Sequence, residues 1–366
     1  MASSSSSSSF FFVLLFGGGL FLFSFDAEAA RVPALYVFGD STADVGNNNY
    51  LEGSHAKANF PHNGVDFPLS RPTGRFSNGY NGVDFLAIHM GFRRSPPPFL
   101  SIGNKISHQT MRGTKGANFA SGGSGILDST GSTITTRKQI QYFATIRSNI
   151  TMQVSTEKAT LLISKSIFLI SAGGNDIFAF FTQNKAPNES QVKQFIDTLV
   201  SAYTDHLKEL YNLGARKFSI IDVPPLGCCP YPRSLNPMGS CLDILNELAL
   251  RFNSAVSVLL HDLSSKMQGM KYSIGSSYNV VSNIIKNPSA LGYKEVKTAC
   301  CGSGKFNGQS GCMPNATYCS DRHRYLYWDM LHPTHATSKY AGVAIYEGSL
   351  SFAAPINLRQ LVEDNS

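Results

Sequence analysis

Three short, largely apolar segments, each running directly into a loop rich in glycine and polar residues, restrict the fold of this chain most strongly. They span residues 34–38, 166–170 and 217–223, and the loops that follow are 39–41, 173–176 and 224–227. Brief apolar runs bounded by such loops are typical of parallel strands that are buried on both faces. The sequence therefore predicts a buried parallel sheet whose strands end in potentially reactive loops.

The segments between these strands have the periodicity of amphipathic helices. Apolar residues recur at helical spacing over 192–210, where Gly214 is the expected C-terminal cap, and again over 245–263 before Gly269. Strands that alternate with such helices predict βαβ units and an α/β fold with helices on both faces of the sheet. Residues 46–98 are rich in Gly, Pro and Asn, and we expect them to form an elaborated loop over the carboxyl edge of the sheet, where α/β sheets bind ligands.

The first 29 residues have the features of a secretory signal peptide. A polar run over 1–9 precedes an apolar stretch over 10–25, and Ala27-Glu28-Ala29 suits an Ala-x-Ala cleavage site. The alternative is a membrane anchor, but the apolar stretch is short for a membrane-spanning helix, which needs about 20 residues. We expect residues 1–29 to be removed and residues 30–366 to form a single domain that is secreted and not stably inserted in a membrane.

Glycosylation motifs and cysteines agree with export. Asn149, Asn188 and Asn315 each begin an Asn-x-Ser/Thr sequon. The chain has seven cysteines, and clustered cysteines in an exported protein more often form disulfides than metal sites. We expect disulfides within the cluster at 300–319 and another that joins either Cys228 or Cys229 to Cys241.

A zinc site is the alternative for the same cluster. Its ligands would come from Cys300, Cys301, Cys312, Cys319 and His323. The spacing contains no Cys-x-x-Cys pair, and an oxidising compartment disfavours thiolate ligands. We therefore expect no metal site there.

The formal net charge of +7 limits the partners only weakly. Such a charge suits an anionic polysaccharide or lipid surface, but a soluble surface without any electrostatic partner fits equally well. The chain has no run of Lys and Arg and no RNA-type aromatic motif, so we expect no nucleic-acid partner.

Ser41 is the first candidate for a chemical role, because it follows the first predicted strand. There its Oγ would be exposed at the top of the sheet, and a helix beginning nearby would direct backbone N–H groups to the same spot, where they stabilise an oxyanion. The alternative is that Ser41 only caps that helix. The segment is neither a Gly-x-Ser-x-Gly elbow nor a Walker loop.

Three further segments offer complementary groups. Asn175 follows two glycines at the end of a strand and can donate its amide N–H to an oxyanion, although an ordinary Gly-Asn turn would look the same. Asp329 lies three positions before His332, close enough to orient the imidazole so that it accepts a proton from Ser41, whereas the alternative is a surface Asp and an unrelated His. The Gly/Ser-rich segment 116–125 supplies a further N–H or is simply a loop.

Together these segments resemble the motif blocks of the SGNH, or GDSL-type, hydrolases, in the order that the family uses. The blocks are Phe-Gly-Asp-Ser-x-x-Asp-x-Gly-Asn-Asn at 38–48, Gly-x-Asn-Phe-Ala-Ser-Gly-Gly at 116–123, Gly-Gly-Asn-Asp at 173–176 and Trp-Asp-x-x-His-Pro-Thr at 328–334. They are most similar to the plant branch of secreted GDSL esterases/lipases, as are segments 224–228 and 299–302, so the resemblance covers roughly residues 34–350. Thr42 stands where the name-giving motif has Leu, at a position with no catalytic role in the family.

The resemblance implies a three-layer α/β/α sandwich with a mainly parallel, five-stranded, flavodoxin-like sheet. It implies a carboxylic ester hydrolase that acts through an acyl-enzyme on Ser41, with His332 as general base and then acid and Asp329 orienting it. The oxyanion hole would comprise the Ser41 N–H, the N–H of Gly123 or its neighbour Gly122, and the Asn175 side chain. No metal or organic cofactor is implied.

The implied partner is an acyl-ester substrate, either a lipid or an acylated cell-wall component or small molecule. Two other functions fit the same fold. One is an extracellular transacylase, which would use the same triad, and the other is a catalytically silent lipid- or carbohydrate-binding protein. The presence of Ser41, Asn175, Asp329 and His332 argues against the silent protein.

Overall fold

The computed structural model describes residues 31–102 and 116–364, and the expected signal peptide at 1–29 lies outside them. Its centre is a six-stranded sheet in the order β2-β1-β3-β4-β5-β8. Five strands run parallel, and the two-residue β8 pairs antiparallel with β5 at one edge. The strands are β1 (Leu35–Gly39), β2 (Gly116–Asn118), β3 (Ile167–Ser171), β4 (Lys217–Ile221), β5 (Lys271–Gly275) and β8 (Ala353–Ala354). The expected mainly parallel α/β sheet is confirmed, with a short sixth strand added.

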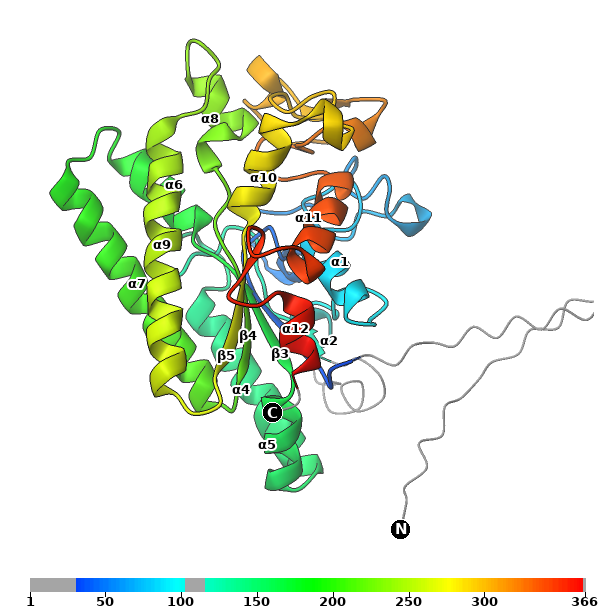
Figure 1. Ribbon diagram of the computed structural model, residues 1–366. Helices are drawn as coiled ribbons and strands as arrows, with labels where there is room; N and C mark the ends of the chain where they lie inside the picture. Colours follow the sequence, from blue (N-terminus) through cyan, green and yellow to red (C-terminus); the bar gives the residue numbers. More distant parts are fainter. Residues whose placement is uncertain (1–30, 103–115, 365–366) are drawn as a thin grey trace, which may run out of the picture.

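Helices cover both faces of this sheet, so the molecule has three layers (Figure 1). One face carries α4 (Thr136–Gln153), α5 (Thr156–Ser164), α6 (Gly174–Gln183), α7 (Glu189–Asn212) and α9 (Asp243–Lys266). The other carries α1 (Gly82–His89), α10 (Ser277–Lys286), α11 (His335–Glu347) and α12 (Leu358–Glu363). Shorter elements are α2 (Phe99–Ile102), α8 (Pro230–Leu235), β6 (Cys301–Gly302), β7 (Thr317–Tyr318) and the 3-10 turns at 47–50, 68–70, 226–228, 289–291, 305–307 and 322–324.

Alternation along the central strands sends side chains into two cores. Tyr36 and Phe38 of β1 face α4, where Phe143 packs edge-on to Tyr36 with ring centroids 4.8 Å apart. Leu35 and Val37 of the same strand face the α1, α10 and α11 side. Burial on both faces explains why these strands are continuously apolar in sequence.

The longest helices and the first strands lie where the sequence predicts them. Helices α7 and α9 contain the two predicted apolar stripes, and Gly214 follows α7 with a positive φ of 107°, which favours glycine. Residues 46–98 differ from the expected loop because they contain α1, which is closed at its start by a reciprocal capping box between Asn81 and Asp84. With only eight residues, α1 is too short to produce a clear apolar period.

Three disulfides form, as expected, in the two cysteine clusters. They join Cys228 to Cys241, Cys300 to Cys319 and Cys301 to Cys312, and Cys229 is buried as a free thiol. The four cysteines of the 300–319 cluster are therefore paired in two disulfides, and their sulfurs are not available as zinc ligands.

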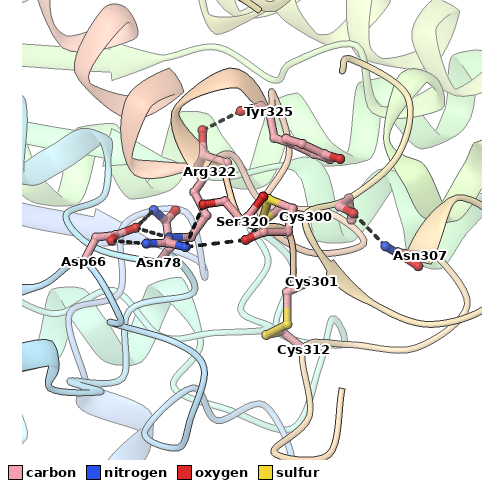
Figure 2. The surroundings of a disulfide bond; sticks show 12 residues. Asp66, Asn78, Cys300, Cys301, Asn307, Cys312, Ser320, Arg322 and Tyr325 are labelled. Carbon is pink, nitrogen blue, oxygen red and sulfur yellow. Dashed lines mark hydrogen bonds and ion pairs between the residues drawn. A yellow bond between two sulfur atoms is a disulfide. The ribbon is translucent and has the colours of Figure 1, made fainter. Parts of the chain in front are cut away.

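The disulfide-bonded segment is fastened to the 46–98 region by an ion pair. The Arg322 guanidinium donates to both carboxylate oxygens of Asp66, at 2.6 and 2.8 Å, and the Asn78 amide donates to the same carboxylate (Figure 2). The Asn78 side-chain oxygen in turn accepts the N–H of His335, the first residue of α11. Arg322, Asp66 and Asn78 thus connect the residues that follow the 300–319 cluster to the start of α11.

The sequons differ in their surroundings. Asn188 and Asn315 are exposed, at the N-cap of α7 and in the loop before β7, whereas Asn149 is half-buried inside α4. Among the described residues, no helix combines the length and the apolarity that crossing a bilayer requires.

Candidate active site

Ser41 lies two residues beyond the end of β1, at the carboxyl edge of the sheet. The strand ends at Gly39, whose φ of 140° favours glycine, and a Cβ there would lie 2.0 Å from the carbonyl oxygen of Ser171 in the neighbouring strand. The next residues form a turn in which Asp40 Oδ1 accepts the N–H of Thr42 at 2.9 Å. The strand thus passes abruptly into a tight turn that carries the serine.

Both expectations about a helix at Ser41 are wrong. The first helical turn after β1 is a 3-10 turn that begins only at Asn47, so Ser41 neither precedes nor caps a helix. Within the described part of the chain, the Ser41 N–H donates to no protein atom. The Ser41 N–H therefore remains available as a hydrogen-bond donor, although no helix begins at Ser41.

His332 reaches Ser41 from the other end of the sequence. Its Nε2 lies 2.7 Å from Ser41 Oγ, and its Nδ1 lies 2.9 Å from each carboxylate oxygen of Asp329. His332 lies in a loop two residues before the N-cap of α11, as Pro333 predicts. The two side chains are buried, at 6% exposure for Asp329 and 8% for His332.

Backbone groups fix the geometry of this pair. Asp329 Oδ1 accepts the N–H groups of Leu331 and His332, at 2.9 and 2.8 Å. The ring of Phe76 packs against the imidazole, with centroids 4.9 Å apart. The imidazole therefore presents one nitrogen to the carboxylate and the other to Ser41.

Burial and charge act in opposite directions on the pKa of His332. Burial favours the neutral ring and lowers its pKa, but the negative charge of Asp329 and the hydrogen bond to it outweigh burial, so that the pKa is raised above the ordinary histidine value. Burial likewise raises the pKa of Asp329, but the imidazole and the backbone donors hold it below its usual value. Asp329 thus stays ionised and stabilises a protonated His332.

Asn175 enters the same cleft from the end of β3. Gly173, with a φ of 114°, is the N-cap of α6, and Asn175 lies in the first turn of that helix. Its amide donates to the carbonyl oxygen of Ser124 at 2.9 Å, which uses one of its two N–H bonds. Ser41, Asn175 and His332 line one cleft, so the Asn175 turn faces the serine.

Gly122 and Gly123 differ in a way that the sequence leaves open. The N–H of Gly122 donates to Asp44 Oδ2 at 3.0 Å, whereas that of Gly123 donates to no atom of the described residues. Gly123 is flanked by Gly122, where a Cβ would lie 2.7 Å from the Phe76 ring, and by Ser124, whose carbonyl holds Asn175. Gly123 is not itself among the residues that line the cleft.

Two carboxylates hold the loops of the site and were missed as positioning residues in the sequence. Asp44 accepts the N–H groups of Gly46, Asn47 and Gly122, and burial raises its pKa to about 6. Asp176 accepts the N–H groups of Ile126 and Leu127 and the hydroxyl of Thr130. Both belong to the motif blocks around Ser41 and Asn175, which is the only sequence signal for them.

His335 follows His332 by three positions but takes no part in the contact with Ser41. It is half-buried at the start of α11, where its Nδ1 accepts the N–H of Tyr80 at 2.9 Å. Its ring packs edge-on against Phe85, and burial lowers its pKa. His335 therefore serves the packing of α11 on the 46–98 region, and of these two histidines it is His332 that contacts Ser41.

The arrangement is suited to nucleophilic catalysis. A hydroxyl hydrogen-bonded to a neutral imidazole, itself held by a carboxylate, can lose its proton as it attacks an electrophilic carbon. Free N–H groups close to that hydroxyl can stabilise the negative charge that then develops. Among the described residues, no group of three or more His, Cys, Asp or Glu side chains is arranged to hold a metal ion.

Comparison with known proteins places this geometry in a family context. The family model described as GDSL-like Lipase/Acylhydrolase matches residues 35–345. The Arabidopsis thaliana protein named GDSL esterase/lipase At5g55050 is 38% identical over 342 residues, covering 91% of this chain and 90% of its own length. A second Arabidopsis thaliana protein, GDSL esterase/lipase At4g16230, is 37% identical over 345 residues, covering 90% of this chain and 91% of its own.

Proposed function

The chain belongs to the GDSL-like lipase/acylhydrolase family and is a carboxylic ester hydrolase, and we propose that it cleaves its substrates through an acyl-enzyme on Ser41. The observation that carries this proposal is the row Asp329–His332–Ser41, with 2.9 Å from the carboxylate to Nδ1 and 2.7 Å from Nε2 to Oγ. The substrate class is an acyl ester, either a lipid or an acylated cell-wall component or small molecule.

In the first half of the reaction, Ser41 Oγ attacks the ester carbonyl carbon while His332 Nε2 takes the hydroxyl proton. The oxyanion that forms accepts hydrogen bonds from the Ser41 N–H, the Gly123 N–H and the second amide N–H of Asn175. Collapse of this intermediate breaks the bond to the alcohol oxygen, and His332 returns its proton to that alcohol. The acyl group then remains on Ser41.

In the second half, water replaces the alcohol. His332 accepts a proton from water as the water oxygen attacks the acyl carbon, and the same donors hold the second oxyanion. Collapse releases the carboxylic acid, and the proton on His332 returns to Ser41 Oγ. Asp329 remains ionised throughout, and it keeps Nδ1 protonated and the ring oriented.

The proposal is tested by trapping the acyl group. The purified protein should hydrolyse p-nitrophenyl butyrate. A fluorophosphonate should form one covalent adduct per protein molecule, and mass spectrometry should locate it on the peptide that contains Ser41. Ser41→Ala should remove the adduct and lower turnover by several orders of magnitude while the circular dichroism spectrum is kept. Ser265→Ala, which alters an exposed serine of α9, is the matched control. A folded Ser41→Ala variant with near-normal turnover would exclude Ser41 as the nucleophile.

We also propose that residues 1–29 are a cleaved signal and that residues 30–366 act as one secreted domain. Three disulfides and the exposed sequons at Asn188 and Asn315 support an extracellular location. N-terminal sequencing of protein recovered from the medium of expressing plant cells should begin close to Ala30. Retention of the full chain inside the cells would contradict secretion.

A further inference from the structure

An apolar cavity of about 130 Å³ lies beside the catalytic cleft, on the side of the sheet that carries α1, α10 and α11. Its walls are mainly aliphatic, with Val83 and Leu86 from α1, Val280 and Val281 from α10, and Ala341 and Ile345 from α11. Nothing in the chemistry of Ser41 and His332 uses this space. It needs an explanation, because aliphatic surface left accessible inside a protein forgoes packing energy.

The cavity and the catalytic cleft are adjacent and share part of their lining. Five residues line both of them, namely Thr42, Ser171, Asp222, Pro224 and Leu331. Leu331 immediately precedes His332, and Thr42 immediately follows Ser41. The shared residues therefore place the cavity next to Ser41, with Leu331 and Pro224 at the boundary between the two spaces.

The polar side chains along this route are mostly occupied within the protein. The Thr42 hydroxyl lies 2.7 Å from Asp40 Oδ1 and 2.8 Å from Ser171 Oγ. The Asp222 carboxylate accepts the Ser276 hydroxyl at 2.7 Å and the N–H of Tyr278 at 2.9 Å. Since these atoms are already satisfied, the route offers a passing chain chiefly hydrocarbon contacts.

From this shared lining we propose that the cavity between α1, α10 and α11 is reached from Ser41 past Leu331 and holds the acyl chain of the substrate, which deepens the function proposed above and rests on it. The acyl half of the ester stays bonded to Ser41 until water arrives, whereas the alcohol half must leave. An apolar space next to the nucleophile therefore suits the acyl half. An apolar cavity of about 150 Å³ accommodates benzene, so this one suits about four to six carbon atoms.

This size predicts the dependence of activity on acyl length. With p-nitrophenyl esters, kcat/KM should rise roughly tenfold to a hundredfold from acetate to hexanoate, because each buried methylene adds apolar transfer energy. The increase should stop at about six to eight carbons, because the carbonyl end stays at Ser41 and about four to six further carbons fill the cavity. The alcohol should matter less, so hexyl acetate should show no comparable gain over ethyl acetate.

Two substitutions fill the cavity from different helices. Val281→Phe on α10 and Ala341→Leu on α11 each add bulk at a half-buried lining position. Each should lower the hexanoate-to-acetate ratio of kcat/KM about tenfold or more. Val343→Phe adds a ring to an exposed position of α11 outside the cavity and is the matched control that should keep the parent ratio. If one of these two cavity-filling variants fails to fold, the other still tests the acyl site.

The outcomes separate the two proposals. A parent protein that hydrolyses no ester of either series would overturn the proposed function and the acyl site with it. If the parent protein is active and the two cavity-filling variants keep its hexanoate-to-acetate ratio of kcat/KM, the acyl site alone is overturned. The acyl site is also overturned if these variants instead change the ratio of kcat/KM between hexyl acetate and ethyl acetate, since the cavity would then bind the alcohol.

Discussion

The Asp44 carboxylate accepts the backbone N–H of Gly122 at 3.0 Å, although 78 residues separate the two in sequence. Its other oxygen accepts the N–H groups of Gly46 and Asn47, so one buried side chain joins the turn that carries Ser41 to the segment that carries Gly123. This carboxylate sets the distance between the nucleophile and one of the proposed oxyanion donors.

Removing that carboxylate should cost both stability and turnover. Asp44→Ala leaves three buried N–H groups without an acceptor, each worth about 1–3 kcal/mol. We expect the urea midpoint of unfolding to fall, and kcat to fall more than KM rises in the fraction that remains folded. Asp128→Ala, which breaks an exposed ion pair with Arg137, is the comparison and should change neither quantity strongly. Normal turnover in folded Asp44→Ala would show that the two loops hold their positions without it.

Asn175 should act mainly on the transition state. Its second amide N–H is directed to the oxyanion in the proposed mechanism, so Asn175→Ala should lower kcat by about 10²–10³-fold with little change in KM. The same substitution removes the hydrogen bond that the Asn175 amide donates to the Ser124 carbonyl. Steady-state kinetics on one p-nitrophenyl ester measures both constants. A raised KM at unchanged kcat would make Asn175 a substrate-binding or structural residue instead.

The pH dependence should reflect the raised pKa of His332. The ring must be neutral to accept the Ser41 proton, so kcat/KM falls as the pH drops through this pKa. Because Asp329 raises the pKa of His332, the midpoint of that fall should lie above the ordinary histidine value of about 6.5. A midpoint below 6 in a profile of kcat/KM against pH would contradict this assignment.

Two variants test which groups produce the acid limb. Asp329→Asn should lower kcat by about 10⁴-fold, because His332 loses the partner that fixes its tautomer. His335→Ala should retain the acid limb, because His335 contacts Tyr80 and not Ser41. If His335→Ala were inactive and His332→Ala remained active, His332 would not be the general base.

Thiol titration should find one free cysteine, and only after the protein is unfolded. Cys229 is buried, and burial raises its pKa to about 12, so the native protein should not react with Ellman's reagent, and the protein unfolded without reductant should show one thiol. Cys300→Ser together with Cys319→Ser should lower the free energy of unfolding by about 3 kcal/mol, whereas Cys229→Ser should cost less, because it closes no loop. Seven reactive thiols after unfolding would refute the disulfides.

Much of the fold was predictable from residues near one another in sequence. Strands β1 and β3 are short apolar runs because both of their faces are buried, and α7 and α9 show the 3.6-residue period because one side of each faces the core. Helix α1 was missed because its eight residues are too few to show a clear apolar period. The turn at Ser41 was misjudged because Asp40 and Asp44, and not a helix, hold the backbone there.

The sequence by itself determined the α/β class, the segments after β1 and β3 that carry Ser41 and Asn175, the loop that carries His332, and the two clusters in which the cysteines pair, because apolar periodicity and short motifs are local properties of the chain. It did not show that Asn175 lies in the first turn of α6 instead of in a loop. The tertiary structure alone decided that His332 reaches Ser41 across 291 residues, that Cys228 and not Cys229 pairs with Cys241, and that Asp44 occupies the N–H of Gly122 but not that of Gly123. It also decided that an apolar cavity between α1, α10 and α11 lies next to the catalytic cleft. These features depend on how distant segments pack against one sheet edge, and such packing is fixed by the summed contacts of the whole core.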